Sequence, residues 1–298
     1  MAEKSIEVII PVRNLAGQIP ELARPLLEQH HENDVITVIN DASTDNTAEV
    51  AAGLGLNVIT LTASHGPYFA RQTAARRSTA DILLFIDGRC RPLPGLLDAH
   101  RELQSRDGVA LSCTDVRTRS GPSLAARVAE LQQPFSLRGR VDIPGRPPYF
   151  PTCNLGIARP AFEAVNGFRV MRGGGDVDIC WRIQEQQLGK MAVDHRVLME
   201  WEPRTSMRDL ASQYRRYGRS TAYLKWAFGD QSPAVYRKDS LVEAVKGEIA
   251  RRKAIRWPTV TEELARISID TVFQFGYLEA KRKRDTFEPP RNYGAEVR

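Results

Sequence analysis

The sequence predicts an α/β fold, in which a doubly wound, mostly parallel sheet is flanked by helices and followed by a helical carboxyl-terminal extension. Two observations support this prediction. In the first half of the chain, short apolar runs alternate with segments that carry Ala and Leu at helical spacing, and such alternation is typical of parallel α/β sheets. From about residue 206 onward the pattern is helical.

Five apolar runs are the predicted strands. Their apolar residues are nearly continuous, as expected for a parallel sheet that is covered on both faces. The predicted strands span residues 6–12, 35–39, 57–61, 82–86 and 109–113. The predicted helices between them span residues 17–29, 44–54, 67–78 and 93–105.

The composition is that of a globular protein with a basic balance. Of the 298 residues, 42% are hydrophobic and 26% are charged, and the formal net charge is +6. This balance favours an anionic partner, such as a phosphorylated small molecule, nucleic acid or an acidic membrane, although a basic solvated surface explains it equally well. The basic segment 280–285 lacks the interleaved aromatic residues of a nucleic-acid-binding module, so no nucleic-acid partner is expected.

The amino-terminal segment lacks the long apolar run of a signal peptide, and no stretch approaches the roughly 20 apolar residues that a bilayer span needs. We therefore expect a cytoplasmic protein, with peripheral membrane contact left open. The cysteines are widely spaced and form no C-x-x-C pair, which favours reduced thiols over zinc ligands or a disulfide framework. They are Cys90, Cys113, Cys153 and Cys180.

Polar clusters follow three of the predicted strands. They are PVRN (11–14), NDASTD (40–45) and DGR (87–89). Ligands of doubly wound sheets collect at the carboxyl ends of the strands, so these clusters are candidate binding residues. No G-x-G-x-x-G or G-x-x-x-x-G-K-[ST] motif is present, and this argues against hydride transfer and P-loop hydrolysis.

Five motifs, taken together and in this order, resemble the family 2 glycosyltransferases of the GT-A fold, which are inverting nucleotide-sugar transferases. They are VIIPVRN (8–14), VINDASTDNT (38–47), ARQTAARRSTADILLFID (70–87), TCNLGIARPAFEAVNGF (152–168) and GGGDVDICWRIQEQQLG (173–189).

The resemblance covers about residues 5–205 and implies how the chain is divided. Residues 1–205 would form the nucleotide-sugar transferase domain, with a donor-binding half at 1–115 and an acceptor and catalytic half at 116–205. Residues 206–298 would form the helical extension, which ends in a basic tail. The loop 134–150 and this tail are expected to be loosely held.

The resemblance implies a donor site at the ends of the first strands. The uracil of a UDP-sugar would lie near Pro11, Val12 and Arg13, and Asp41 would hydrogen-bond to the base. Two alternatives stay open. Pro11 would only end a strand, and Arg71 would only be a solvated helix charge, as is expected for the nearby Arg76 and Arg77. The implied donor-binding residues are Pro11, Val12, Arg13, Asn14, Asp41, Arg71, Asp87 and Arg89.

Asp176 matches the catalytic base of the family. Relatives usually read Glu-Asp at this point, whereas this chain reads Gly175-Asp176. A carboxylate at the start of a helix can accept a proton from an acceptor hydroxyl, and the helix dipole helps to keep it ionised. The alternative is a structural one, with Asp176 as an N-cap and Asp178 as a first-turn charge.

A further set of residues is implied on the acceptor or diphosphate side. QYRRY (213–217) matches a Q-x-x-R-aromatic motif, and its spacing places the three motif residues on one helix face. A basic amphipathic helix resting on a membrane is the competing interpretation of this segment. The implied residues are Asn154, Asp178, Trp181, Gln213, Arg216 and Tyr217.

The family implies a divalent metal, Mn²⁺ or Mg²⁺, held by a D-x-D motif and a histidine after the last strand. Here the motif reads Asp87-Gly88-Arg89, and residues 197–204 contain Glu200 and Glu202 but no histidine. Asp87 could hold a metal together with waters, or Arg89 could pair directly with the diphosphate. The sequence favours reduced metal dependence, unless Glu200 or Glu202 is a ligand.

The sequence therefore predicts an inverting glycosyltransferase that moves a sugar from a nucleotide-diphosphate donor, a UDP-sugar by resemblance, to a hydroxyl or amine. The alternative is a catalytically degenerate protein that binds a nucleotide sugar without turnover, which the altered metal positions would support. The sequence specifies neither the sugar, nor the acceptor, nor the oligomeric state.

Overall fold

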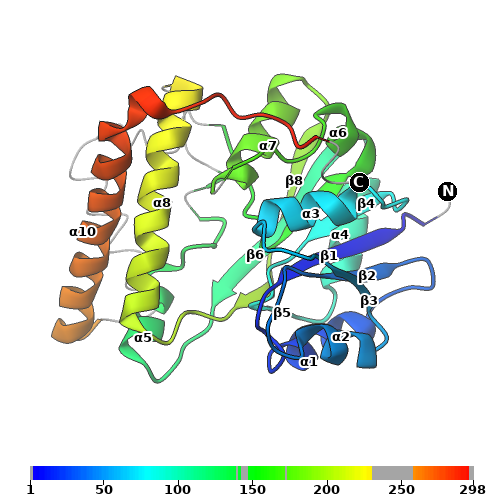
Figure 1. The fold of residues 1–298 in the computed structure, drawn as a ribbon. Coiled ribbons are helices and arrows are strands. Elements are labelled where there is room, and N and C mark those ends of the chain that lie inside the picture. Colours follow the sequence, from blue (N-terminus) through cyan, green and yellow to red (C-terminus); the bar gives the residue numbers. More distant parts are fainter. Residues whose placement is uncertain (1–2, 139, 142–146, 172, 230–257, 295–298) are drawn as a thin grey trace.

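A computed structural model describes residues 3–138, 140–141, 147–171, 173–229 and 258–294 (Figure 1). These residues form one eight-stranded sheet with the strand order β3-β2-β1-β4-β7-β6-β8-β5. The strands are β1 (Ile6–Val12), β2 (Val35–Asn40), β3 (Asn57–Thr60), β4 (Ile82–Phe85), β5 (Cys90–Pro92), β6 (Val109–Thr118), β7 (Leu155–Ala158) and β8 (Lys190–Trp201).

The helices follow the strands in the alternating order that the sequence predicts. They are α1 (Ile19–Leu27), α2 (Thr47–Gly53), α3 (Pro67–Ala75), α4 (Leu96–Ser105), α5 (Leu124–Gln132), α6 (Arg159–Ala164), α7 (Gly175–Glu185), α8 (Met207–Phe228) and α10 (Val260–Arg282), with a short 3₁₀ turn at η2 (Arg284–Thr286). The α/β prediction and its five strands are confirmed.

The sheet is more mixed than the sequence indicated. Strands β1 to β4 pair in parallel, but β7 runs antiparallel to both β4 and β6, and β5 runs antiparallel to β8. The sequence analysis did not name β5, β7 or β8. Strands β5 and β7 are only three and four residues long, and β8 is interrupted by charged residues, so none of them has the continuous apolar run that marks a buried parallel strand.

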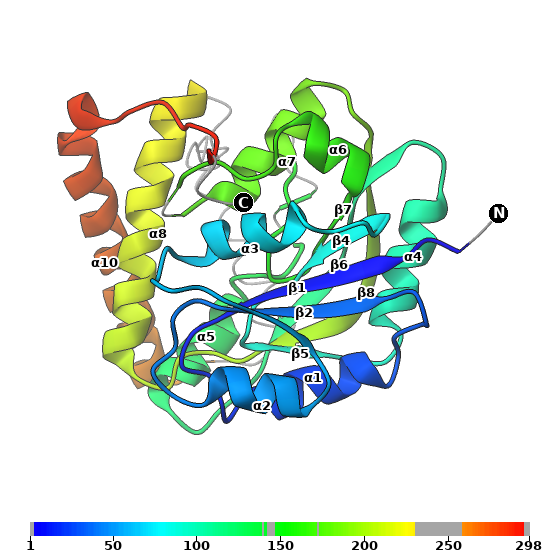
Figure 2. The ribbon, with the colours of Figure 1, turned by 45° about the vertical axis from the view of Figure 1, so that its right-hand side comes forward.

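Helices cover both faces of the sheet (Figure 2), and apolar side chains fill the space between the helices and the strands. On one face, residues of α3, α6 and α7 pack against the sheet around Phe85 and Phe168. On the other face, residues of α1, α2 and α4 pack around Ile10 and Leu84. Both layers exclude water from the strands, which leaves the carboxyl ends of β1, β2 and β4 as the open edge where ligands collect in such sheets.

Helices α8 and α10 form a pair beside this edge (Figure 1). One side of α8 packs against α5 and α10 through the apolar parts of Met207, Leu210 and Tyr214. Gly218 and Gly276 lie where the two helices touch, because a Cβ on either residue would collide with the backbone of the other helix. The apolar face of α8 is therefore covered by protein, which removes the basis for membrane contact through α8.

The prediction of a loose carboxyl-terminal tail is wrong for the described part of the tail. The backbone N–H of Val170 donates to the carbonyl of Arg291 at 2.8 Å, and the Tyr293 ring is buried edge-on against Phe69, with 5.5 Å between ring centroids. Arg76 also differs from expectation, because its guanidinium donates to the Tyr293 carbonyl at 2.9 Å. An aromatic residue near the end of the basic tail anchors the tail to α3.

The four cysteines are free and buried, as the spacing predicted. Among the helices of the described ranges, none combines the length and the apolar character needed to cross a membrane.

Candidate functional site

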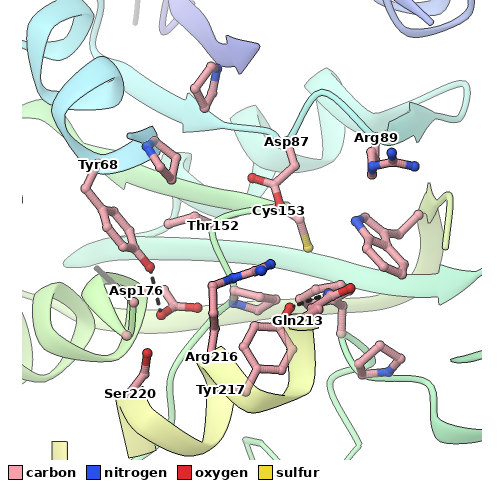
Figure 3. Close-up of a pocket in the computed structure, with 18 of the residues that line it drawn as sticks. Tyr68, Asp87, Arg89, Thr152, Cys153, Asp176, Gln213, Arg216, Tyr217 and Ser220 are labelled. Carbon is pink, nitrogen blue, oxygen red and sulfur yellow. Dashed lines mark hydrogen bonds between the residues drawn. The ribbon is translucent and has the colours of Figure 1, made fainter. Parts of the chain in front are cut away.

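A cavity of about 800 Å³ lies between the carboxyl edge of the sheet and α8. The end of β1, the start of α3, the turn after β4 and the first turn of α7 form one side, and α8 forms the other (Figure 3). Most of the residues named from the sequence converge here. Those that line the cavity are Pro11, Arg13, Asn14, Arg71, Asp87, Arg89, Asp176, Gln213, Arg216 and Tyr217.

Asp176 occupies the first turn of α7 and faces the cavity. Burial raises the pKa of this carboxyl, while the backbone N–H of Val177 and the nearby Arg140 and Arg71 oppose the shift. The Tyr68 hydroxyl lies 3.5 Å from Asp176 Oδ1, as Figure 3 shows. A carboxylate whose pKa is shifted towards the working pH is suited to accept a proton.

The Tyr68 ring also accounts for Gly175, which stands where relatives usually carry Glu. A Cβ at residue 175 would lie 2.7 Å from the Tyr68 ring, so a larger side chain there would displace the ring. Burial, followed by the charge of Asp176, raises the pKa of the Tyr68 phenol well above its usual value. Tyr68 therefore remains a neutral hydrogen-bond donor beside the carboxylate.

Arg71 forms an ion pair with Asp87 at the end of β4. The Arg71 side chain is only 3% exposed, and its Nε has no hydrogen-bond partner among the described residues. A buried polar atom without a partner costs free energy. Because Arg71 lines the cavity, its guanidinium is positioned to add to the positive charge of the cavity wall.

Cations outnumber carboxylates in the cavity wall. Arginine supplies six of the described lining residues, whereas the carboxylates are Asp87 and Asp176 alone. Guanidinium groups match phosphate oxygens in charge and geometry, so this wall is suited to a diphosphate. The six are Arg13, Arg71, Arg89, Arg140, Arg204 and Arg216.

In the view of Figure 3, the Arg216 guanidinium extends from α8 to the side of Asp87 that faces Asp176, while Arg89 lies on the other side of Asp87. Arg216 is exposed, and its Nη1 donates to Ser212 Oγ at 3.1 Å. Gln213 Nε2 donates to the Tyr217 hydroxyl at 2.7 Å, and burial raises the pKa of Tyr217. The Q-x-x-R-aromatic motif thus presents one cation and a neutral hydrogen-bonded pair to the cavity.

Two predicted donor-binding residues do not line the cavity. Asp41 lies behind it, where its carboxylate accepts hydrogen bonds from Ser64 Oγ at 2.8 Å and from the backbone N–H groups of His65 and Gly66 at 2.9 and 3.1 Å. It therefore fixes the loop before α3 in place. Val12 is buried in the core beneath the turn after β4.

Asn154 is also turned away from the cavity. It is fully buried, accepts a hydrogen bond from His100 Nε2 at 2.9 Å and donates to the Thr114 side chain at 2.7 Å. Burial lowers the pKa of His100 to about 4, which keeps the imidazole neutral within this network. Asn154 holds the loop that carries Cys153, a cavity residue, against the sheet.

Asp178 and Trp181 point from α7 into the core. Asp178 is fully buried and pairs with Arg182 at 2.7 Å and with Arg169 at 3.4 Å. Trp181 donates to the Pro147 carbonyl at 3.1 Å and packs edge-on against Phe228. Their contacts are structural, and Asp176 is the α7 carboxylate that faces the cavity.

The donor set at the altered D-x-D motif does not fit a divalent metal held by several carboxylates. Asp87 already pairs with Arg71. Glu200 pairs with Arg117, and Glu202 with Arg91 at 3.0 Å, and neither glutamate lines the cavity. Within the described ranges, no three His, Cys, Asp or Glu side chains gather in a way that could hold a metal ion.

Several cavity residues were missed by the sequence analysis. Arg140 and Tyr149 come from the loop that was expected to be loosely held, where the Arg140 guanidinium lies 5.1 Å from the centre of the Tyr149 ring. Arg204 follows β8, and Ser220 lies one helical turn beyond Arg216 on α8. A sequence signal existed only for Tyr68, which precedes Arg71 by one helical turn.

The fold and this cavity together define an α/β protein with a cationic ligand site at the carboxyl edge of its sheet. The chain belongs to glycosyl transferase family 2, since the model of that family matches residues 7–165. The GT-A fold expected from the sequence is thereby confirmed.

Relatives agree with this assignment. The pre-mycofactocin glycosyltransferase of Mycobacterium tuberculosis (strain CDC 1551 / Oshkosh) is 28% identical over 232 residues, which are 75% of this chain and 48% of that protein. This chain thus spans about half the length of the curated relatives it matches.

Two solved structures share the fold. The mannosyltransferase PcManGT from Pyrobaculum calidifontis, in complex with GDP-Man and Mn²⁺, has a TM-score of 0.60 at 16% identity, covering 96% of this chain and 85% of that one. Mannosyl-3-phosphoglycerate synthase from Rubrobacter xylanophilus has a TM-score of 0.54 at 22% identity, covering 81% and 80%.

Proposed function

We propose that this chain transfers a sugar from a nucleotide-diphosphate donor to an acceptor hydroxyl or amine, with inversion at the anomeric carbon. The observation that carries the proposal is the position of Asp176, which faces a cavity of about 800 Å³ whose lining also contains six arginines. Such a cavity can hold a substrate between a base and a cluster of cations.

Asp176 acts as the base in this mechanism. Its carboxylate accepts the proton of the acceptor hydroxyl or amine as the acceptor atom attacks the anomeric carbon. The bond between that carbon and the diphosphate oxygen breaks on the opposite face, and its electron pair leaves with the diphosphate. A single displacement of this kind inverts the configuration of the anomeric carbon. Tyr68 orients the carboxylate through its hydroxyl.

Arginine side chains stabilise the departing diphosphate. Negative charge grows on the diphosphate in the transition state, and cations fixed in advance at that position lower the barrier. Arg71, with its unpartnered Nε, and Arg216, from α8, are the guanidinium groups that we assign to this role. PcManGT carries Mn²⁺ in its complex. In this chain we propose that fixed arginines supply most of the positive charge at the diphosphate.

The base of the donor would lie at the end of β1, beside Pro11, Arg13 and Asn14. Arg13 Nη1 donates to Ser64 Oγ at 3.0 Å, and Ser64 in turn donates to Asp41. Asp41 would therefore act on the base through Ser64 and the loop before α3. We propose a uridine nucleotide from the family resemblance, with a guanosine nucleotide, as in the PcManGT complex, as the alternative to be tested.

A thermal-shift series with UDP-, GDP-, ADP- and TDP-sugars, each with EDTA and with Mn²⁺, tests the proposal. A ligand that binds the folded state raises the melting temperature, and we expect one nucleotide class to do so in both conditions. Hydrolysis of the same donors then separates the two functions. If a donor binds but releases no nucleoside diphosphate, either alone or with any of a panel of acceptors, the chain is a nucleotide-sugar-binding protein without turnover.

A further inference from the structure

The side of α10 that faces away from α8 carries a stripe of mostly apolar side chains, and Figure 1 shows the helix at the outside of the molecule. The positions of the stripe repeat every three or four residues and lie opposite the buried residues Ile269 and Gly276. Five large apolar side chains on this stripe are between 47% and 78% exposed. We define the outer stripe as Val260, Leu264, Ile267, Thr271, Phe275, Leu278 and Arg282, which together span about 33 Å at 1.5 Å per residue.

The acidic residues of α10, including those that border the outer stripe, are paired with cations within the chain. Glu262 pairs with Arg127 of α5 at 2.8 Å, and Glu279 pairs with Arg219 of α8 at 2.7 Å. Glu263 and Asp270 pair with Arg266, each at 2.7 Å. No residue of the outer stripe is acidic, and the carboxylates that border the stripe are paired with cations of the chain.

The carboxyl-terminal end of the stripe is basic. Lys281, Arg282 and Lys283 are consecutive and exposed, and within the described ranges none of the three forms an ion pair. Three cations without an ion-pair partner in the described ranges thus lie beside five exposed apolar side chains. A partner that binds both groups must offer negative charge and an apolar interior. Exposed apolar surface of this extent on one helix face marks an interaction site.

We infer that the outer stripe of α10 docks on the surface of an anionic lipid bilayer. The helix would lie in the plane of the interface, with its apolar side chains between the acyl chains and its basic end against the headgroups. Docking needs no membrane-spanning segment. The inference is independent of the proposed function, because it concerns a face of the molecule that points away from Asp176.

Two other partners fit this face less well. A second copy docked through the same stripe would bring α10 acids that are already paired within the chain. Beyond these it would bring Asp285, a single exposed carboxylate beside a longer run of cations. A nucleic acid offers phosphates but no apolar interior for Leu264 and Phe275. An anionic lipid bilayer offers acyl chains to the apolar side chains of the outer stripe and negatively charged headgroups to its basic end.

Vesicle co-sedimentation tests the inference. Phosphatidylcholine vesicles are compared with vesicles that also contain phosphatidylglycerol. We expect the parent chain to bind the anionic vesicles, and Leu264→Ser/Phe275→Ser to bind them about tenfold or more weakly, because it removes buried apolar area. Lys281→Gln/Arg282→Gln/Lys283→Gln should lose the preference for anionic vesicles by a similar factor, since each cation near the surface contributes to the attraction.

Matched controls keep the result specific. Val35→Ser removes an exposed apolar side chain at the start of β2, and Arg24→Gln/Arg77→Gln removes two exposed cations elsewhere; neither should change binding. Each variant must also melt at the temperature of the parent. The inference is overturned if the parent does not sediment with anionic vesicles, or if controls and stripe variants bind alike. It is also overturned if light scattering shows a dimer that only Leu264→Ser/Phe275→Ser disrupts.

Discussion

Arg71 and Asp87 form an ion pair in the wall of the cavity, with side chains that are 3% and 32% exposed. This pair joins α3 to the end of β4, and it neutralises the one carboxylate that remains of the D-x-D motif. The Arg71 guanidinium thus lies beside Asp87, where members of the family would hold a metal ion against the diphosphate. The pair also leaves Asp176 as the cavity carboxylate that is available to accept a proton.

Asp176→Asn should abolish most of the transfer activity while folding and donor binding are preserved. The substitution keeps the shape of the side chain but removes the proton acceptor, and the usual loss for a positioned base is roughly 10²–10⁴-fold. Single-turnover rates at saturating donor measure this loss, and calorimetry with the nucleoside diphosphate measures binding. Turnover near that of the parent would move the role of base to another residue.

Asp178→Asn should behave in the opposite way, although it lies only two residues further along α7. Its carboxylate is fully buried between Arg182 and Arg169, and removing one partner of a buried ion pair typically costs about 3–5 kcal/mol. We expect a clearly lower melting temperature and, in the protein that remains folded, a nearly normal rate. A stable variant with a large rate defect would contradict the structural role of Asp178.

The pH dependence of transfer should reflect the raised pKa of Asp176. A base must be ionised to accept a proton, so kcat/KM falls as the pH drops through this pKa. Burial raises the pKa, and the acid limb of the profile should therefore lie above the pH of an ordinary aspartate. Arg140 lowers the same pKa by its charge, so Arg140→Gln should move the limb to higher pH. A limb that does not move would show that Asp176 is not the titrating group.

The sequence predicts the strands better than the site, because a strand is marked by local residues whereas the role of a side chain depends on partners far away in the chain. Strands β1 and β4 are marked by apolar runs that any buried parallel strand must have. The use of a carboxylate depends on distant partners. Asp41 is held by residues more than twenty positions later in the chain, and no local pattern distinguishes it from a ligand-binding acid.

The same limit applies to the residues that were missed. Arg140 belongs to a segment rich in Pro, Gly and Arg, and its position at the cavity is fixed by contacts with Tyr149 and with the backbone carbonyls of Pro134 and Ser136. Tyr68 is recognisable as a partner of Asp176 only after α3 and α7 are packed together, since the two residues are 108 positions apart. Asp176 itself was predictable because a helix start and a family motif coincide at that residue.

Tyr293→Ala should destabilise the protein through loss of the tail anchor. The ring is buried against Phe69 of α3, and truncating a buried aromatic side chain costs about 3 kcal/mol or more. Because α3 carries Tyr68 and Arg71, we also expect a higher KM for the donor. Thermal melting measures the loss of stability, and donor titration measures the change in KM. Tyr277→Ala, which truncates a half-buried tyrosine of α10 instead of the tail anchor, is the comparison for the effect on KM. An unchanged melting temperature would mean that the tail is not an anchor.

The last prediction concerns the charge that stabilises the diphosphate. Arg216→Gln should lower the transfer rate at every Mn²⁺ concentration, since Arg216 lines the cavity and its guanidinium lies on the side of Asp87 that faces Asp176. Arg89→Ala should lower it less, because Arg89 lies to one side of Asp87. Arg89→Asp rebuilds the D-x-D motif, and a second carboxylate there repels the diphosphate unless a divalent ion lies between them. This variant should therefore require a metal that the parent does not. The decisive measurement is the transfer rate against Mn²⁺ concentration for the four proteins, each first treated with a chelator. If the parent loses all activity on chelation and Arg89→Ala matches it at every concentration, the arginine assignment is wrong and the diphosphate depends on a metal.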